Sequence, residues 1–160
     1  MSAGRIVVDL NTQTLHWLDA SGGDADFLVS TSKFGAGEQN GSFKTPRGRH
    51  IVRAKIGAGA PLGAVFVARR PTGEIYSQQL AASCPDRDWI LTRILWLSGL
   101  ELGRNRLGAV DTMRRYIYIH GAPDDAPMGV PGSIGCIRMR NTDVATLFDL
   151  AGPGTKVDIR

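Results

Sequence analysis

Short apolar runs alternate with turn residues along most of the chain, a pattern typical of strand-rich proteins. In the first third, these runs predict strands at residues 5–10, 13–18, 27–31 and 49–56. Asn11-Thr12 marks a turn between the first two runs. A Gly-rich stretch at residues 35–48 predicts a long loop that ends in Thr45-Pro46-Arg47-Gly48.

The same pattern continues over the rest of the chain, where further runs predict strands at residues 64–68, 74–79, 92–97, 116–119 and 156–159. We expect the run at 74–79 to pair with the run at 64–68. Residues 89–97 are the most apolar stretch, and periodicity alone does not separate a buried strand from a short helix there. We favour a strand over 92–97. The Tyr-Ile-Tyr-Ile run at 116–119 predicts a strand that delivers His120 at its end.

Helical spacing appears at residues 141–150, where Val144 and Leu147 fall on one face. Asn141 is a favourable N-cap residue at the start of this segment. Gly152-Pro153-Gly154 ends it, because neither residue type continues a helix. The elements together predict a mainly β single domain over residues 1–160, with one or two short helices.

Composition supports an ordinary globular domain, with 160 residues, 42% hydrophobic, 21% charged and 20 Gly. The net charge is +4, and the cations are scattered apart from pairs such as Arg69-Arg70 and Arg114-Arg115. Without a basic stripe interleaved with aromatics, nucleic acid is not an expected partner. A carboxylate-bearing substrate and a merely basic surface both remain compatible with this charge.

The N-terminal sequence Met1-Ser2-Ala3-Gly4-Arg5 runs directly into a strand pattern, without the apolar segment of a secretory signal. We therefore expect a cytoplasmic protein if Met1 is the natural start, and a periplasmic or cell-wall protein if a signal was removed. No stretch approaches about 18 apolar residues, so no membrane partner is expected. The oligomeric state is left open.

Candidate chemistry concentrates in residues 116–140. His120 and Cys136 lie 16 positions apart, with a Pro- and Gly-rich segment between them that can fold back and bring the two side chains together. An imidazole near a thiol can take its proton and make it a nucleophile. Gly135 allows close approach of backbone, and the N–H groups around Gly135 and Cys136 could form an oxyanion hole. A small buried core cysteine and a structural histidine are the alternative interpretation.

His120-Gly121 together with Ser133-Ile134-Gly135-Cys136-Ile137-Arg138-Met139 resembles the signature of the L,D-transpeptidase catalytic domain family (YkuD). Thr45-Pro46-Arg47-Gly48 resembles the Thr-Pro-x-Gly loop of the family, and Ile6-Val7-Val8-Asp9-Leu10 its opening strand. The resemblance extends over about residues 5–160. It implies a β-sandwich-like fold, a cysteine acyl-enzyme, and a substrate with an L,D peptide bond in peptidoglycan.

By resemblance, Cys136 is the nucleophile, His120 the general base, and the Gly121 carbonyl holds the useful imidazole tautomer. Ser133 is expected to order the cysteine loop. The residues expected to bind the substrate or its oxyanion are Ser133, Ile134, Gly135 and Arg138. Arg138 is expected to support the site or to face a substrate carboxylate. Many family members have His between the Ser and the Gly, whereas this chain has Ile134, which removes a polar group from the cleft.

The expected substrate is a peptidoglycan tetrapeptide or muropeptide, cleaved between residue 3, often meso-diaminopimelate, and D-Ala. Release of the acyl-enzyme by water would make an L,D-carboxypeptidase of peptidoglycan recycling, the outcome we favour from the N-terminal sequence. Release by an amine would make an exported transpeptidase that forms 3→3 cross-links. A non-catalytic module that binds peptidoglycan stems is a third possibility.

Residues outside the motif are not expected to take part in catalysis. His16 and His50 are not expected to be catalytic, and Cys84 is expected to be structural or incidental. The spacing of three His and two Cys predicts neither a metal site nor a cofactor. Residues 77–92 and 99–112 are candidates for loops that cover the cleft.

Overall fold

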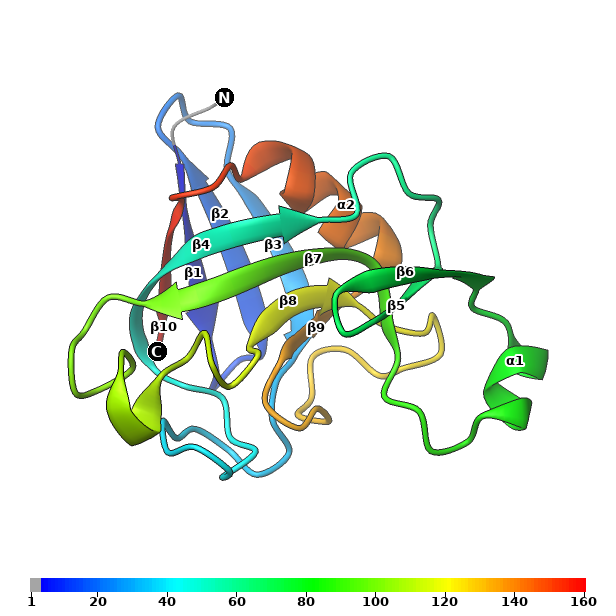
Figure 1. Ribbon diagram of the computed structural model, residues 1–160. Coiled ribbons are helices and arrows are strands. Elements are labelled where there is room, and N and C mark those ends of the chain that lie inside the picture. The colour runs from blue at the N-terminus through cyan, green and yellow to red at the C-terminus, as the bar shows by residue number, and fades with distance from the viewer. Residues whose placement is uncertain (1–3) are drawn as a thin grey trace.

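Residues 4–160 are described by a computed structural model, in which ten strands join in one sheet (Figure 1). The strands are β1 (Gly4–Asp9), β2 (Thr14–Asp19), β3 (Ala25–Ser30), β4 (Gly48–Ile56), β5 (Ala64–Val67), β6 (Arg70–Ile75), β7 (Ile90–Gly99), β8 (Tyr118–Gly121), β9 (Ile137–Met139) and β10 (Lys156–Ile159). The helices are α1 (Gln78–Ser83), α2 (Asn141–Leu150) and the short 3₁₀ helix η1 (Gly108–Val110). No helix within residues 4–160 is long and apolar enough to cross a membrane.

The sheet closes on itself through β4. Its order runs β4-β10-β1-β2-β3-β9-β8-β7, and β7 pairs again with β4. The β5–β6 hairpin continues from the beginning of β7, since Val65 and Phe66 pair with Leu91 and Ile90. Most neighbours are antiparallel, but β1–β10 and β8–β9 are parallel. The mainly β prediction is confirmed.

Alternation along the strands sends one set of side chains into the larger of two apolar cores, and the smaller core is formed by Ala64, Phe66, Ile94 and Tyr118. Ile6 and Val8 of β1 and Leu15 and Trp17 of β2 are fully buried in the larger core. Helix α2 packs against β7 and β8 and adds its own apolar face to this core. Burial of each large side chain of this kind contributes about 1.5–3 kcal/mol, which fixes β8 and β9 as a firm platform.

Two predicted strands are displaced along the chain. The strand expected at 116–119 begins at Tyr118, because Tyr116 has a positive φ of 57° and turns the backbone before β8. The strand expected at 74–79 is β6, which ends at Ile75. It does pair with β5, as predicted, but Ser77 then caps α1 by accepting a hydrogen bond from the Leu80 N–H.

The predicted helix at 141–150 is confirmed, but the cap assigned to Asn141 is wrong. Arg140 holds the N-cap position and makes no side-chain capping bond. The Asn141 side chain is buried, where Nδ2 donates to the Ala122 carbonyl at 3.0 Å and Oδ1 accepts from the Thr92 hydroxyl at 2.6 Å. The amide thus provides partners for a buried hydroxyl group of β7 and for a carbonyl group just after β8, which burial would otherwise leave unsatisfied.

Candidate active site

The parallel pairing of β8 with β9 places Cys136 and His120 on one face of the sheet. His120 lies opposite Arg138, so Cys136, two residues earlier, falls opposite Tyr118. Since side chains alternate along a strand, these four share the face opposite the larger core, where Cys136 packs against the smaller core that contains Tyr118. The Tyr118 N–H lies 3.3 Å from Cys136 Sγ, which fixes this register at the thiol.

Cys136 lies in a cleft of about 440 Å³ on this face. Its walls are formed by five segments of the chain, which contribute Phe43, Ala68, Arg69, Asp88, Ile90, Arg115, Tyr116, Ile117, Tyr118 and Ile134. The Ile134 side chain is 44% exposed and makes one wall apolar at the position where many family members have a histidine.

Burial raises the pKa of the Cys136 thiol to about 12, although Arg138 and Arg115 act in the opposite direction. The thiol donates a hydrogen bond to the Tyr116 carbonyl oxygen at 3.3 Å. Both observations describe a neutral S–H group and not a preformed thiolate.

The His120 imidazole is also neutral. It is 1% exposed, and burial lowers its pKa. Nδ1 lies 2.6 Å from the Gly121 carbonyl oxygen, so Nδ1 carries the proton and donates it. No residue within 4–160 hydrogen-bonds Nε2, which leaves this nitrogen as an acceptor.

A neutral thiol and a neutral imidazole on one face can act as a nucleophile and its general base. In this structure the hydrogen bonds of the thiol go to the backbone of Tyr116 and Tyr118, and not to His120. Proton transfer therefore requires the S–H bond to turn from the Tyr116 carbonyl toward Nε2. Such contacts commonly shorten when substrate binds.

Gly121 is required beside the histidine by close packing. A Cβ at this position would collide with Asn141 Oδ1 and with the Leu91 carbonyl oxygen. The residue that holds the imidazole tautomer is thus wedged between β7 and the start of α2, where it has little freedom to move.

The loop before Cys136 is fixed by two hydroxyl groups. Ser133 Oγ donates to the Cys136 carbonyl at 2.6 Å and accepts from the Gly135 N–H at 3.2 Å. Thr45 Oγ1 donates to the Gly135 carbonyl at 2.9 Å and accepts from the Ser32 N–H at 3.0 Å. Gly135 itself has a φ of 132°, which side-chain-bearing residues rarely adopt.

These contacts reduce the number of backbone amides that can form the predicted oxyanion hole. The Gly135 N–H already donates to Ser133 Oγ, so it is not free to bind a developing oxyanion. Of the two amides in the prediction, that of Cys136 remains the candidate.

Arg138 supports the site from behind the loop. One Nη donates to the Gly132 carbonyl and the other to Asp88 Oδ1, both at 3.2 Å. Of its two expected roles, this geometry favours support, because Asp88 already occupies the end of the guanidinium that a substrate carboxylate would need.

Several residues of the cleft were not predicted as site residues. Ala68 and Arg69 form the turn of the β5–β6 hairpin with φ of 48° and 65°. Arg69 donates to the Tyr118 hydroxyl at 2.8 Å and lies over the rings of Trp96 and Tyr116. The Arg69-Arg70 pair is visible in the sequence, but its aromatic partners lie far along the chain.

Arg115 is a second arginine of the cleft that was not predicted as a site residue. It donates to the carbonyls of Gly37 at 3.3 Å and Lys44 at 2.5 Å, and thereby joins the Gly-rich loop to the cleft. Its charge also lowers the pKa of Cys136, though by less than burial raises it.

Of the two candidate covering loops, residues 77–92 reach the cleft through Asp88 and Ile90. Residues 99–112 line a neighbouring groove instead. His50 is buried elsewhere, between the Gly48 carbonyl and the Thr112 hydroxyl.

The chain is similar to known proteins of one family. The family model of the L,D-transpeptidase catalytic domain, YkuD, matches residues 3–159. The probable L,D-transpeptidase YcfS of Escherichia coli K12 is 49% identical over 41 residues, which are 26% of this chain and 13% of that protein.

Solved structures share the fold. The L,D-transpeptidase from Mycobacterium smegmatis has a TM-score of 0.58 at 19% identity and covers 99% of this chain. L,D-transpeptidase 3 from Mycobacterium tuberculosis, in complex with a faropenem-derived adduct, has a TM-score of 0.61 at 15% identity and also covers 99%. This chain spans 59% and 60% of those two proteins. The family-wide match confirms the resemblance in the motifs, and the chain belongs to the L,D-transpeptidase catalytic domain family.

Proposed function

We propose that this protein cleaves the L,D bond between residue 3 and D-Ala of peptidoglycan tetrapeptides through a thioester on Cys136. The observation that carries the proposal is the Cys136 thiol in a cleft of about 440 Å³, with the buried His120 imidazole and its free Nε2 on the same face of the β8–β9 pair. A buried structural cysteine would need neither the cleft nor the free nitrogen.

In the first half-reaction, His120 Nε2 takes the proton of the Cys136 thiol as Sγ attacks the carbonyl carbon of residue 3. The tetrahedral intermediate then expels the amine of D-Ala, to which His120 returns the proton. A thioester between Cys136 and the tripeptide remains. The neutral pair suits this sequence, because His120 is an acceptor before attack and a donor afterwards.

We further propose that water completes the reaction, which makes the protein an L,D-carboxypeptidase. Arg69 and Arg115 line the cleft, and its one acidic residue, Asp88, is paired with Arg138. A positive cleft favours the carboxylate of D-Ala and disfavours the ammonium group that an amine acceptor would bring.

Transpeptidation is the second candidate, and the relatives favour it, since those reported above are named L,D-transpeptidases. A related structure holds imipenem. By analogy, we expect imipenem to acylate Cys136, which gives a test of the thiol that does not depend on the natural acceptor.

The test is to incubate the protein and a Cys136→Ala control with a tetrapeptide, with and without an amine acceptor, and to identify the products by mass spectrometry. Tripeptide and D-Ala at a rate unaffected by acceptor support hydrolysis. Cross-linked dimer that appears with acceptor supports transpeptidation. No turnover by a folded protein that binds the tetrapeptide would overturn the enzymatic proposal in favour of a binding module.

A further inference from the structure

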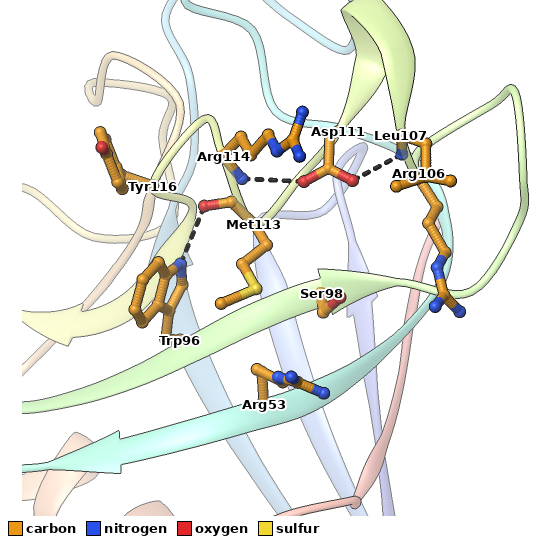
Figure 2. A pocket seen from close by; sticks show the side chains of 9 residues that line it. All are labelled: Arg53, Trp96, Ser98, Arg106, Leu107, Asp111, Met113, Arg114 and Tyr116. Atoms are coloured by element: carbon orange, nitrogen blue, oxygen red, sulfur yellow. Dashed lines mark hydrogen bonds between the residues drawn. The ribbon is translucent and has the colours of Figure 1, made fainter.

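A second groove of about 370 Å³ lies beside the cysteine cleft, with Tyr116 lining both (Figure 2). Its apolar part is formed by Trp96 and Met113, and Trp96 Nε1 donates to the Met113 carbonyl at 3.1 Å. Ser98 of β7 adds a hydroxyl. Figure 2 shows the Met113 side chain reaching between Trp96 and Ser98.

Three arginines surround this groove without partners. The guanidinium groups of Arg53, Arg106 and Arg114 make no hydrogen bond, ion pair or ring contact within residues 4–160. Elsewhere in the molecule, Arg47, Arg87, Arg104, Arg138 and Arg160 are each paired with a carboxylate. This groove therefore gathers three unpaired guanidinium groups, and unlike the groove lined by Arg5, Arg49 and Lys156 it shares a wall residue, Tyr116, with the cysteine cleft.

The acidic residue of the groove does not neutralise these cations by pairing. Asp111 accepts the Leu107 N–H on one carboxylate oxygen at 2.5 Å and the Arg114 N–H on the other at 2.9 Å. Figure 2 shows both bonds, which hold the backbone of the groove wall. Three positive charges against one negative charge leave the groove attractive to an anion.

The groove is connected to the reacting atoms through aromatic packing. The Trp96 ring lies 6.1 Å from that of Tyr116 and 5.9 Å from that of Tyr118, measured between centroids. The backbones of these two tyrosines hold the Cys136 thiol. A peptide bound at the thiol could therefore extend past the exposed Tyr116 ring into the groove.

We propose that this groove binds a free carboxylate of the substrate peptide outside the scissile bond, with Arg53 and Arg106 as the residues that select it. The inference rests on the proposed function and specifies its substrate: a stem whose residue 3 carries an unamidated side-chain carboxylate, as diaminopimelate does. The guanidinium groups are planar donors that match a carboxylate, and Trp96 and Met113 contact the aliphatic part of the side chain.

The test measures binding by calorimetry in the full chain with Cys136→Ala, so that no turnover occurs. The ligands are two diaminopimelate-containing tetrapeptides, one with the side-chain carboxylate free and one with it amidated. We expect the free acid to bind about tenfold more tightly than the amide. Arg53→Gln with Arg106→Gln should remove that difference, whereas Arg5→Gln, an exposed arginine of β1, should preserve it.

A preference for the free acid that survives the double substitution, or no preference in the parent protein, would overturn the groove assignment and leave the proposed function intact. Failure of both peptides to bind would overturn the proposed function and the groove assignment with it. In the protein with Cys136 present, imipenem acylation should be unchanged by Arg53→Gln and Arg106→Gln. A slower acylation would show that the substitutions disturb the cleft itself, which also contradicts a role confined to carboxylate selection.

Discussion

At the scale of single residues, the site is built to keep its reacting pair uncharged at rest. Burial raises the pKa of Cys136 and lowers that of His120, and both shifts stabilise the neutral forms. The Gly121 carbonyl then decides which imidazole nitrogen is free. In this arrangement the Cys136 sulfur becomes a strong nucleophile only during attack, when His120 takes its proton. The resting enzyme holds a thiol and not a thiolate.

This account predicts the pH dependence of Cys136 alkylation in a Cys84→Ala protein. The rate constant with iodoacetamide should keep rising with pH to beyond pH 9, because the thiol has a pKa of about 12. The rate is followed by intact-protein mass spectrometry, with Cys136→Ala as the control for labelling at other groups. A plateau reached below pH 8 would show a preformed thiolate and contradict the neutral pair.

At the scale of elements, the cleft is assembled by loops that hydroxyl and guanidinium groups tie together. Thr45 links the Gly-rich loop to the cysteine loop, and Arg115 binds carbonyls of the same Gly-rich loop. Ser133 closes the cysteine loop on itself. These bonds join segments up to 90 residues apart, so the position of Sγ depends on the whole set.

Local pattern was sufficient to predict most strands and the helix at 141–150, because each depends on periodicity, and the motif singled out the two segments, around His120 and Cys136, that the structure pairs side by side. The true start of β8 could not be predicted, since the Tyr-Ile-Tyr-Ile run continues unchanged across the turn at Tyr116. The buried amide of Asn141 was equally hidden: its partner Thr92 lies 49 residues away. Arg69 and Asp88 entered the site through tertiary packing alone.

At the scale of the whole molecule, β4 closes the sheet by pairing with both β10 and β7. His50 lies buried in this strand, with Nδ1 3.0 Å from the Gly48 carbonyl and Nε2 2.9 Å from the Thr112 hydroxyl. Burial lowers the pKa of His50 from 6.5 to about 4. The closed sheet therefore contains a histidine that must stay neutral.

Stability should consequently fall on acidification. Below pH 6.5, His50 becomes protonated in the unfolded chain. In the folded protein it stays neutral until the pH falls to its lowered pKa of about 4. At pH 5 this difference costs about 2 kcal/mol of the free energy of unfolding, at about 1.4 kcal/mol per pH unit. His50→Gln should lower stability at pH 7 but reduce the loss between pH 7 and pH 5 by that amount, as measured by urea denaturation.

Between pH 7 and pH 5, the change in stability comes from histidines and not from carboxyl groups. The pKa values of Glu38, Glu74 and Glu101 are lowered in the folded protein, so these groups reduce stability only when the pH falls to about their ordinary value of 4.5. His120 contributes with the same sign and is present in both proteins, so it cancels in the comparison. An identical loss in parent and variant would contradict the buried neutral His50.

The most direct test of the central claim is to trap the acyl-enzyme. The protein is mixed with a tetrapeptide, quenched with acid within the first turnover, and analysed by intact and peptide mass spectrometry. We predict an adduct of the tripeptide without D-Ala, attached to Cys136 and absent from Cys136→Ala. Release of D-Ala without any adduct on Cys136, or an adduct at another residue, would contradict a reaction through this thiol.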